Sequence, residues 1–272
     1  MKHKFLLIIA LTLVCGMVGC TPTNTTNSTS VSTPNTQPTQ PKISYTLSNK
    51  TADVTLEVTG NSDIPTTFME SNHLKEENIG TIYIQDGITG IDTKAFYQCY
   101  FDIVFMHNCN SLVSIGDYAF THCTMQTITL PDKGVKYIGE GAFQYCHQIT
   151  SFSIPDGVTA VNDYTFYDCI RLKSIDIPDS VTSIGNCAFD GCFNLKNVDI
   201  PDGVTSIGKE AFGYCTNLDD VSIPDSVTII DDDAFKDCPH LTIHCSKGSY
   251  AESYAIEHNI TTMTSLSDND KP

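Results

Sequence analysis

The sequence predicts an α/β repeat solenoid: seven coils of about 23 residues with short parallel strands and helical turns, capped at both ends. Three observations lead to this fold class. A Phe followed three residues later by a Cys recurs along the chain at an almost constant spacing. The apolar residues of each unit keep the same positions, and the segments before and after the repeats have patterns of their own.

Residues 1–19 have the order of a secretory signal peptide. Lys2 and Lys4 precede an apolar run over residues 5–14, which is too short to span a bilayer, and small residues follow. The end of this leader, Met17-Val18-Gly19-Cys20, resembles a bacterial lipobox, whose cysteine receives diacylglycerol. The resemblance implies that Cys20 is lipidated and that the exported protein is anchored at the outer face of the cell membrane. The alternative is an ordinary cleaved signal in which the cysteine is coincidental.

Residues 20–41 are expected to form a disordered stalk. Residues 21–41 contain eight Thr, four Pro, three Asn and three Ser, and Val31 is their single aliphatic residue. Such a segment buries too little apolar surface to offset the entropy of ordering it.

Residues 42–78 are expected to cap the start of the repeats. Ile43, Tyr45 and Leu47 alternate with polar residues, and the same alternation returns over residues 54–58. This pattern predicts a hairpin, which would close an otherwise unpaired strand edge. A short helix is expected around residues 70–77.

The repeats occupy residues 79–242. The repeated aromatic residues, which are separated by 24 and then five times by 23 positions, are Phe96, Phe120, Phe143, Phe166, Phe189, Phe212 and Phe235. The cysteines that follow them are Cys99, Cys123, Cys146, Cys169, Cys192, Cys215 and Cys238. Pro-Asp-Gly or Pro-Asp-Ser after most strands supplies a turn.

One unit cannot cover its eight apolar positions, so the units must stack. Parallel strands lie about 4.8 Å apart, which predicts a column roughly 35 Å long with a ladder of identical side chains inside it. We therefore expect Phe189 to pack between Phe166 and Phe212, and the next residue, Asp190, to face solvent.

Residues 243–264 are expected to form the second cap. Within residues 249–258, Tyr250, Ala251, Tyr254 and Ala255 share one helical face, which predicts a helix across the end of the column. Residues 265–272 are a polar tail.

The charge balance excludes one class of partner. From residue 42 onward there are 13 basic and 32 acidic residues. Nucleic-acid affinity rests mainly on Lys and Arg that neutralise phosphates, so binding to nucleic acid is not expected. The expected contact with the membrane is through the lipid anchor alone.

The cysteine ladder is expected to consist of free, buried thiols. Neighbouring coils would bring the Cα atoms within disulfide range, but side chains in register point the same way, and an odd number leaves one thiol without a partner. Cys245 takes a core strand position in the second cap. Cys109 and Cys187 lie outside the ladder, with an open redox state, and Cys187 is expected to be exposed and the most reactive thiol.

No catalytic, metal or cofactor site is predicted. His122-Cys123 and Cys146-His147 lack the spacing of zinc ligands, and no hydrolase elbow, phosphate loop or His-Glu-x-x-His motif occurs. Turn capping is the favoured role of the acidic turn residues, with calcium binding as the alternative. These residues are Asp86, Asp132, Asp156, Asp179, Asp202 and Asp225.

One outward position in each strand lies between two core residues and varies from coil to coil. The seven residues there are Tyr83, Phe105, Thr129, Ser153, Asp176, Asp199 and Ser222, which we call the strand face. An extended, variable surface on a regular core suits a protein or glycan partner better than a small molecule. The alternative is that these are merely soluble strand residues.

The repeat resembles the BspA-like class of bacterial leucine-rich repeats, with the pattern L-x-x-V-x-I-P-x-x-V-x-x-I-G-x-x-A-F-x-x-C over about residues 79–260. The resemblance implies a curved, right-handed coil on a secreted or lipid-anchored surface protein. It also implies adhesion to host or neighbouring-cell proteins or glycans. The expected function is therefore a non-enzymatic surface adhesin, with a structural spacer or surface-assembly protein lacking its own ligand as the alternative.

Overall fold

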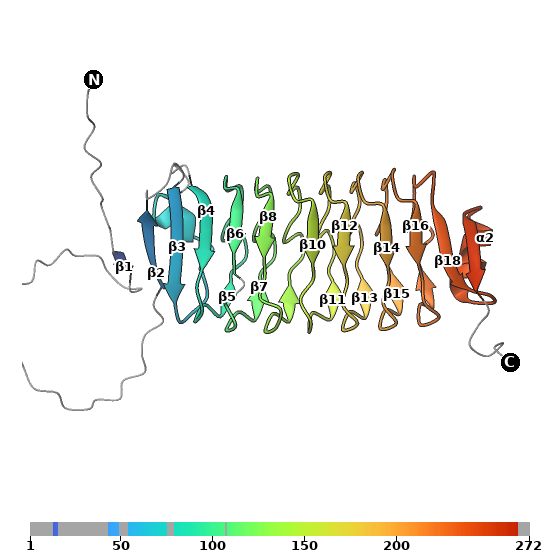
Figure 1. Cartoon of the computed structure of the whole chain (residues 1–272), viewed down its shortest axis with the longest axis horizontal. Coiled ribbons are helices and arrows are strands. Elements are labelled where there is room, and N and C mark those ends of the chain that lie inside the picture. The colour runs from blue at the N-terminus through green and yellow to red at the C-terminus, as the bar shows by residue number, and fades with distance from the viewer. Residues whose placement is uncertain (1–12, 16–42, 49–53, 75–78, 107, 266–272) are drawn as a thin grey trace, which may run out of the picture.

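Short strands stack in two rows along an elongated column in the computed structural model, which describes residues 13–15, 43–48, 54–74, 79–106 and 108–265 (Figure 1). Each regular coil adds a three-residue strand to the first row and a two-residue strand to the second. The predicted repeat solenoid is confirmed. Its parallel stacking extends beyond the seven repeats at both ends, since β3 (Val54–Gly60) already runs parallel to the first repeat strand.

The first row contains the longer strands. They are β4 (Ile79–Ile84), β6 (Ile103–Phe105), β8 (Thr127–Thr129), β10 (Ser151–Ser153), β12 (Ser174–Asp176), β14 (Asn197–Asp199), β16 (Asp220–Ser222), β18 (Thr242–Ser246) and β19 (Thr261–Ser265). The hydrogen-bonded sheets of this row have the orders β1-β2-β3-β4-β6-β8, β10-β12 and β14-β16-β18-β19, where β1 is Leu13–Cys15 and β2 is Ile43–Ser48. Partners in the regular part are 23 residues apart, such as Phe152 and Ile175, so equivalent side chains lie next to each other.

The second row follows each Pro-Asp turn. Its strands are β5 (Gly90–Ile91), β7 (Ser114–Ile115), β9 (Tyr137–Ile138), β11 (Ala160–Val161), β13 (Ser183–Ile184), β15 (Ser206–Ile207) and β17 (Ile229–Ile230). They form two sheets, β5-β7-β9 and β11-β13-β15-β17, in parallel register.

The Ala-Phe-x-x-Cys segment forms a single hydrogen-bonded turn on the third side of each coil. The N–H of Cys169, for example, donates to the carbonyl of Phe166, three residues back. The N–H of Phe166 donates to the carbonyl of Ala188 in the next coil, 2.8 Å away. The repeats therefore contain less helical structure than the spacing of their Phe and Cys residues predicts. In the described residues, both α-helices lie in the caps.

The core is the predicted ladder of aromatic rings. Phe189 lies 5.4 Å from Phe166 and 5.2 Å from Phe212, measured between ring centroids, with the rings within 13° of parallel. The same stacking joins every neighbouring pair from Phe96 to Phe235.

The N-terminal cap contains the predicted hairpin. Strand β2 (Ile43–Ser48) pairs antiparallel with β3 over its whole length, and the short β1 (Leu13–Cys15) pairs antiparallel with β2. The cap helix differs from the prediction: α1 (Phe68–Ser71) begins earlier and ends before Asn72, because Phe68 packs against the ring of Phe96 and His73 has a left-handed backbone. Residues 75–78 lie outside the described part.

The C-terminal cap contains the predicted helix, α2 (Tyr250–Glu257), whose first turn is capped by the Ser249 side chain. Ala251, Tyr254 and Ala255 are buried, and the Tyr254 ring closes the column next to Phe235. Tyr250, which was predicted to share that face, is 47% exposed. After α2 the chain adds β19 parallel to β18.

The remaining predictions for the chain ends fall on undescribed residues. Cys20, the stalk, most of the leader and residues 266–272 lie outside the described part. None of the helices in the described part is both long enough and apolar enough to span a membrane.

Candidate functional site

The strand face lies where the alternation of the strands places it. In β4 the side chain of Tyr83 points outward between the buried Ile82 and Ile84. The other six residues of the face are also exposed or half-buried. The predicted positions therefore form a row of accessible side chains along the first row of strands.

The row begins with two stacked aromatic rings. Tyr83 and Phe105 are register partners on β4 and β6, and their ring centroids lie 5.1 Å apart with an angle of 23° between the planes. The Tyr83 side chain is 36% exposed. Stacking fixes both rings, so a partner would meet a rigid aromatic surface and lose little side-chain entropy in ordering it.

In the next part of the row, serine hydroxyls donate hydrogen bonds to aspartate carboxylates. Ser153 donates to Oδ2 of Asp176 at 3.1 Å, and Ser222 donates to Oδ1 of Asp199 at 2.7 Å, in each case from a neighbouring coil. These bonds orient the two carboxylates as fixed acceptors on an exposed surface. Thr129, between the aromatic and polar parts, has a buried hydroxyl without a hydrogen-bond partner in the described residues.

The structure extends the row at both ends. Glu57 is the register partner of Tyr83, while His244 follows Ser222 and Met263 follows His244. His244 pairs with the carboxylate of Asp220 at 2.6 Å, across the width of the face. The 23-residue repeat pattern did not identify these residues, because they belong to the caps and not to the repeats. The alternation of buried and exposed residues in the cap strands could have predicted them.

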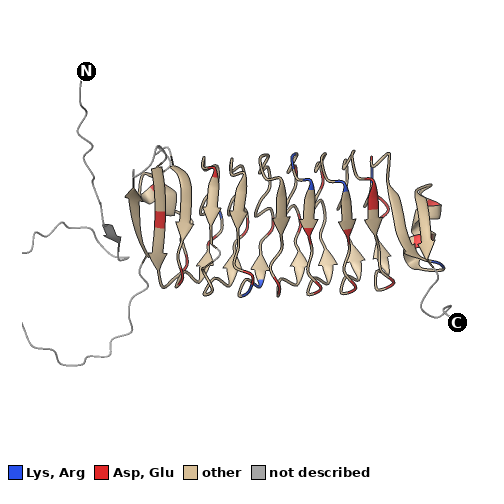
Figure 2. Ribbon diagram, in the orientation of Figure 1, with Lys and Arg blue, Asp and Glu red and all other residues tan. Residues whose placement is uncertain are grey.

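Acidic residues outnumber basic residues, 32 against 15 in the whole chain. Figure 2 shows Asp and Glu along the strands and again in the lower turns, whereas Lys and Arg are few. Such a surface favours a partner that presents cationic or hydrogen-bond-donating groups.

A second accessible surface lies on the turn side of the coils. His122 stacks on Tyr145 with centroids 4.3 Å apart, and Tyr145 meets Tyr167 edge-on at 5.4 Å. Partial burial lowers the pKa of His122. The sequence analysis missed this cluster, although Tyr and His recur between the ladder Phe and Cys. Its members are Tyr97, His122, Tyr145, His147, Tyr164 and Tyr167.

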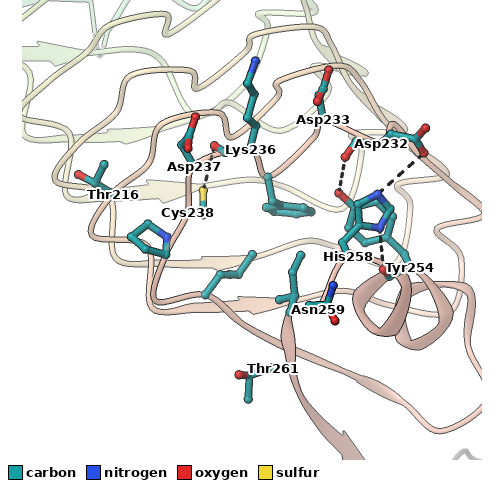
Figure 3. A pocket seen from close by; sticks show the side chains of 14 residues that line it. Thr216, Asp232, Asp233, Lys236, Asp237, Cys238, Tyr254, His258, Asn259 and Thr261 are labelled. Atoms are coloured by element: carbon teal, nitrogen blue, oxygen red, sulfur yellow. Dashed lines mark hydrogen bonds and ion pairs between the residues drawn. The ribbon is translucent and has the colours of Figure 1, made fainter.

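An open crevice of about 610 Å³ lies between parts of the last coil and α2 (Figure 3). The Tyr254 hydroxyl donates to the carbonyl of Asp232, and Nδ1 of His258 lies 2.8 Å from the carbonyl of Tyr254. The Cys238 thiol donates to the carbonyl of Phe212, and burial raises its pKa to about 12. Cys238 is therefore protonated near neutral pH and does not supply a nucleophilic thiolate here.

The ladder cysteines and Cys245 are free thiols, as predicted, and Cys109 and Cys187, whose redox state was left open, are free as well. Those of the ladder are buried apart from the half-buried Cys238, and Cys245 is buried in the second cap. Cys109, outside the ladder, is also buried, and its thiol lies near the carbonyls of Gln85 and Ile88.

Two predictions of exposure are wrong. Cys187 is only 9% exposed, because Tyr164 and Glu210 at the equivalent positions of the adjoining coils lie against it. Burial raises the pKa of its thiol to about 11, so it is not the reactive cysteine that was expected. Asp190 is 7% exposed, and desolvation raises its carboxyl pKa to about 6.

The predicted turn aspartates do not come together as a metal site in the described residues. Asp86 instead accepts the N–H of Ser111 from the next coil, in the manner expected of a turn cap. The only described group of at least three suitable side chains close enough to share an ion is Cys187, Asp190 and Glu210.

The repeats of this chain match a known protein family. The family model for the BspA-type leucine-rich repeat region matches residues 67–169 and 136–262, with six copies of the repeat. These matches cover more than half of the chain. The chain belongs to the BspA-type leucine-rich repeat family.

A solved structure agrees with this family at the level of the fold. A leucine-rich repeat protein from Eubacterium ventriosum is 20% identical to this BspA-type chain, with a TM-score of 0.51 over 76% of this chain and 70% of the other. A leucine-rich repeat protein from Bacteroides ovatus is 22% identical, with a TM-score of 0.43 over 75% and 69% of the two chains. A comparison with curated protein sequences gave no match.

Proposed function

We propose that this protein is a lipid-anchored cell-surface binding protein, an adhesin that contacts proteins or glycans of a host or a neighbouring cell. The strand face is the proposed contact surface, and catalysis is not part of the proposal. Membership of the BspA-type family supports the repeat scaffold. The lipobox-like end of the leader, ending at Cys20, supports the anchor.

The observation that carries the proposal is the ordered, accessible and variable row of strand-face side chains. Identical core positions recur in every coil, yet the outward position changes from the Tyr83–Phe105 stack to the Asp176 and Asp199 carboxylates. If these positions served only solubility, polar residues would be sufficient, and a packed pair of accessible aromatic rings would have no role.

The chemistry of the row defines the class of partner. Stacked aromatic rings offer apolar contact area, and the two oriented carboxylates accept hydrogen bonds. A protein or glycan surface that presents donors or basic groups beside an apolar patch matches both parts. A small ligand fits less well, because this row is an extended surface and not an enclosed pocket.

The test is a binding array of extracellular matrix proteins, glycans and whole partner cells, probed with the purified protein. We expect at least one reproducible ligand whose binding weakens as salt increases, since the acidic residues contribute. An array without any ligand contradicts the adhesin proposal.

A second candidate function is surface assembly without a separate ligand. Strand β19 lies at the edge of its sheet, its side chains are mostly exposed, and Met263 is 60% exposed. An edge strand offers unpaired backbone groups to another chain. Analytical ultracentrifugation distinguishes the candidates: concentration-dependent end-to-end oligomers in the absence of any array ligand favour assembly, whereas a monomer with a ligand favours adhesion.

A further inference from the structure

Three side chains that could ligate a metal converge on the turn side of the column. Cys187 and Asp190 belong to one coil, and Glu210 occupies in the next coil the position that Cys187 occupies in its own. One ligand atom from each lies within 4.8 Å of the other two. The thiol of Cys187 is 3.8 Å from Oε2 of Glu210.

The backbone holds these residues in place. The N–H of Cys187 donates to the carbonyl of Lys209 at 2.8 Å, which ties the two turns together beside the cluster. Both Cys187 and Glu210 have left-handed backbone conformations with φ of 51°, so their side chains leave the coils in the same direction. The arrangement is therefore preorganised by the solenoid and does not depend on a mobile loop.

Asp190 is the residue of the cluster whose burial is least compensated. It is 7% exposed, and Lys236, whose charge acts on its carboxylate, forms its ion pair with Glu210 instead. The N–H of Gly191 also acts on this carboxylate, but it donates to the carbonyl of Gly213 as well, at 2.9 Å. Burying a carboxyl group with so little compensation is costly, which points to a ligand that completes the site.

The neighbouring coil makes room for that carboxylate. Gly213 occupies the position equivalent to Asp190, and a Cβ atom there would lie 3.1 Å from Oδ1 of Asp190 and 3.2 Å from the Cβ of Glu210. A larger residue would crowd the cluster.

The surrounding charges leave one oxygen of Glu210 available. Lys236 pairs with Oε1 of Glu210 at 3.0 Å, while Oε2 faces the Cys187 thiol. Asp168 adds negative charge near Asp190, and the Tyr164 hydroxyl lies against the Cys187 thiol. The cluster is therefore net acidic when its carboxyl groups are ionised, as a cation site requires.

We propose that Cys187, Asp190 and Glu210 bind one zinc-class divalent cation and so clamp two adjacent coils together. One thiolate and two carboxylates are ligands that Zn²⁺ accepts, at distances of about 2.3 Å and 2.0–2.2 Å, with a water completing the tetrahedron. Ca²⁺ and Mg²⁺ are disfavoured because they require oxygen ligands throughout. This site is independent of any ligand on the strand face.

Binding exchanges protons for the metal. Burial keeps the Cys187 thiol protonated near neutral pH, so the ion displaces its proton to the solvent as the S–metal bond forms. The step involves no change of oxidation state.

The experiment uses the full chain, stripped with a chelator and titrated with Co²⁺ as a spectroscopic probe, followed by Zn²⁺. We expect one equivalent of Co²⁺, a thiolate-to-cobalt charge-transfer band in the near ultraviolet, and loss of that band as Zn²⁺ displaces the probe. Wild-type protein without this band overturns the proposal.

Variants locate the site. Cys187→Ser should abolish the band, and Glu210→Gln and Gly213→Ala should each weaken Co²⁺ binding at least tenfold. Cys245→Ser, another buried thiol, and Asp237→Asn, an exposed acid, are the matched controls and should retain the band. Circular dichroism confirms that each variant is folded, and Glu210→Gln and Gly213→Ala decide the question if Cys187→Ser does not fold. A band that persists in Cys187→Ser, or unchanged affinity in both other site variants, contradicts the assignment.

Discussion

The thiol of Cys192 donates a hydrogen bond to the carbonyl oxygen of Phe166, one coil back, across 3.3 Å. The same bond recurs for the other ladder cysteines from Cys123 to Cys238, with distances of 3.0–3.2 Å. A small apolar residue of similar size would fill the space but would lack this donor. The ladder therefore uses cysteine as a hydrogen-bonding core residue.

The ladder thiols should resist alkylation in the native protein. Burial raises the pKa of Cys146, Cys169, Cys192 and Cys215 well above the usual range, so the reactive thiolate is scarce at pH 8. Mass spectrometry after iodoacetamide treatment should find these four unmodified in the native state and labelled in guanidinium chloride. Rapid native labelling would show that the ladder is not closed.

A substitution in the aromatic ladder should be costly. Phe189→Ala removes a ring that is stacked on both sides and should lower the free energy of unfolding by about 3–5 kcal/mol. Because stability in repeat proteins depends on neighbouring units, unfolding of this variant could divide into two transitions.

The control for this experiment has to be chosen from the structure. Asp190, which the sequence suggested as a solvent-exposed neighbour, is buried, whereas Lys196 is exposed. Lys196→Ala should cost less than about 0.5 kcal/mol in the same denaturant melts. Equal losses in Phe189→Ala and Lys196→Ala would mean that the core has been assigned to the wrong face.

Periodicity predicted the parts of the fold that repeat. The Phe–Cys register placed the ladder, and the alternation of Tyr83 between two isoleucines placed the strand face, because each depends only on the spacing along one coil. The hairpin was predictable for the same reason, since residues 43–47 and 54–58 alternate independently of the repeats.

The sequence could not predict what depends on the neighbours of a coil. Cys187 was expected to be exposed because it aligns with variable polar residues, yet Tyr164 and Glu210 in adjacent coils cover it. Asp190 was misassigned in the same way. The proposed metal ligands Cys187 and Glu210 are 23 residues apart, so motif searches that require close spacing do not find them.

The anchor prediction concerns a residue outside the described part of the chain. Cys20 should become the lipidated first residue of the mature protein, because it ends the lipobox-like segment. Cys20→Ala should leave the protein unprocessed or release it from the membrane, whereas Cys15→Ala should not. Membrane fractionation and mass spectrometry of the mature N-terminus test this. An unmodified N-terminus within residues 21–41 would rule out the lipid anchor.

The most direct test of the central proposal measures the affinity of the array ligand for a strand-face variant carrying Tyr83→Ala, Phe105→Ala, Asp176→Asn and Asp199→Asn. A matched control carries Tyr250→Ala and Asp225→Asn, which replace an exposed aromatic residue and an exposed acid away from the strand face. We expect the strand-face variant to bind at least tenfold more weakly, a loss of about 1.4 kcal/mol or more, and the control to bind like the wild type. Unchanged affinity in the folded strand-face variant would contradict the proposal that this row is the binding surface.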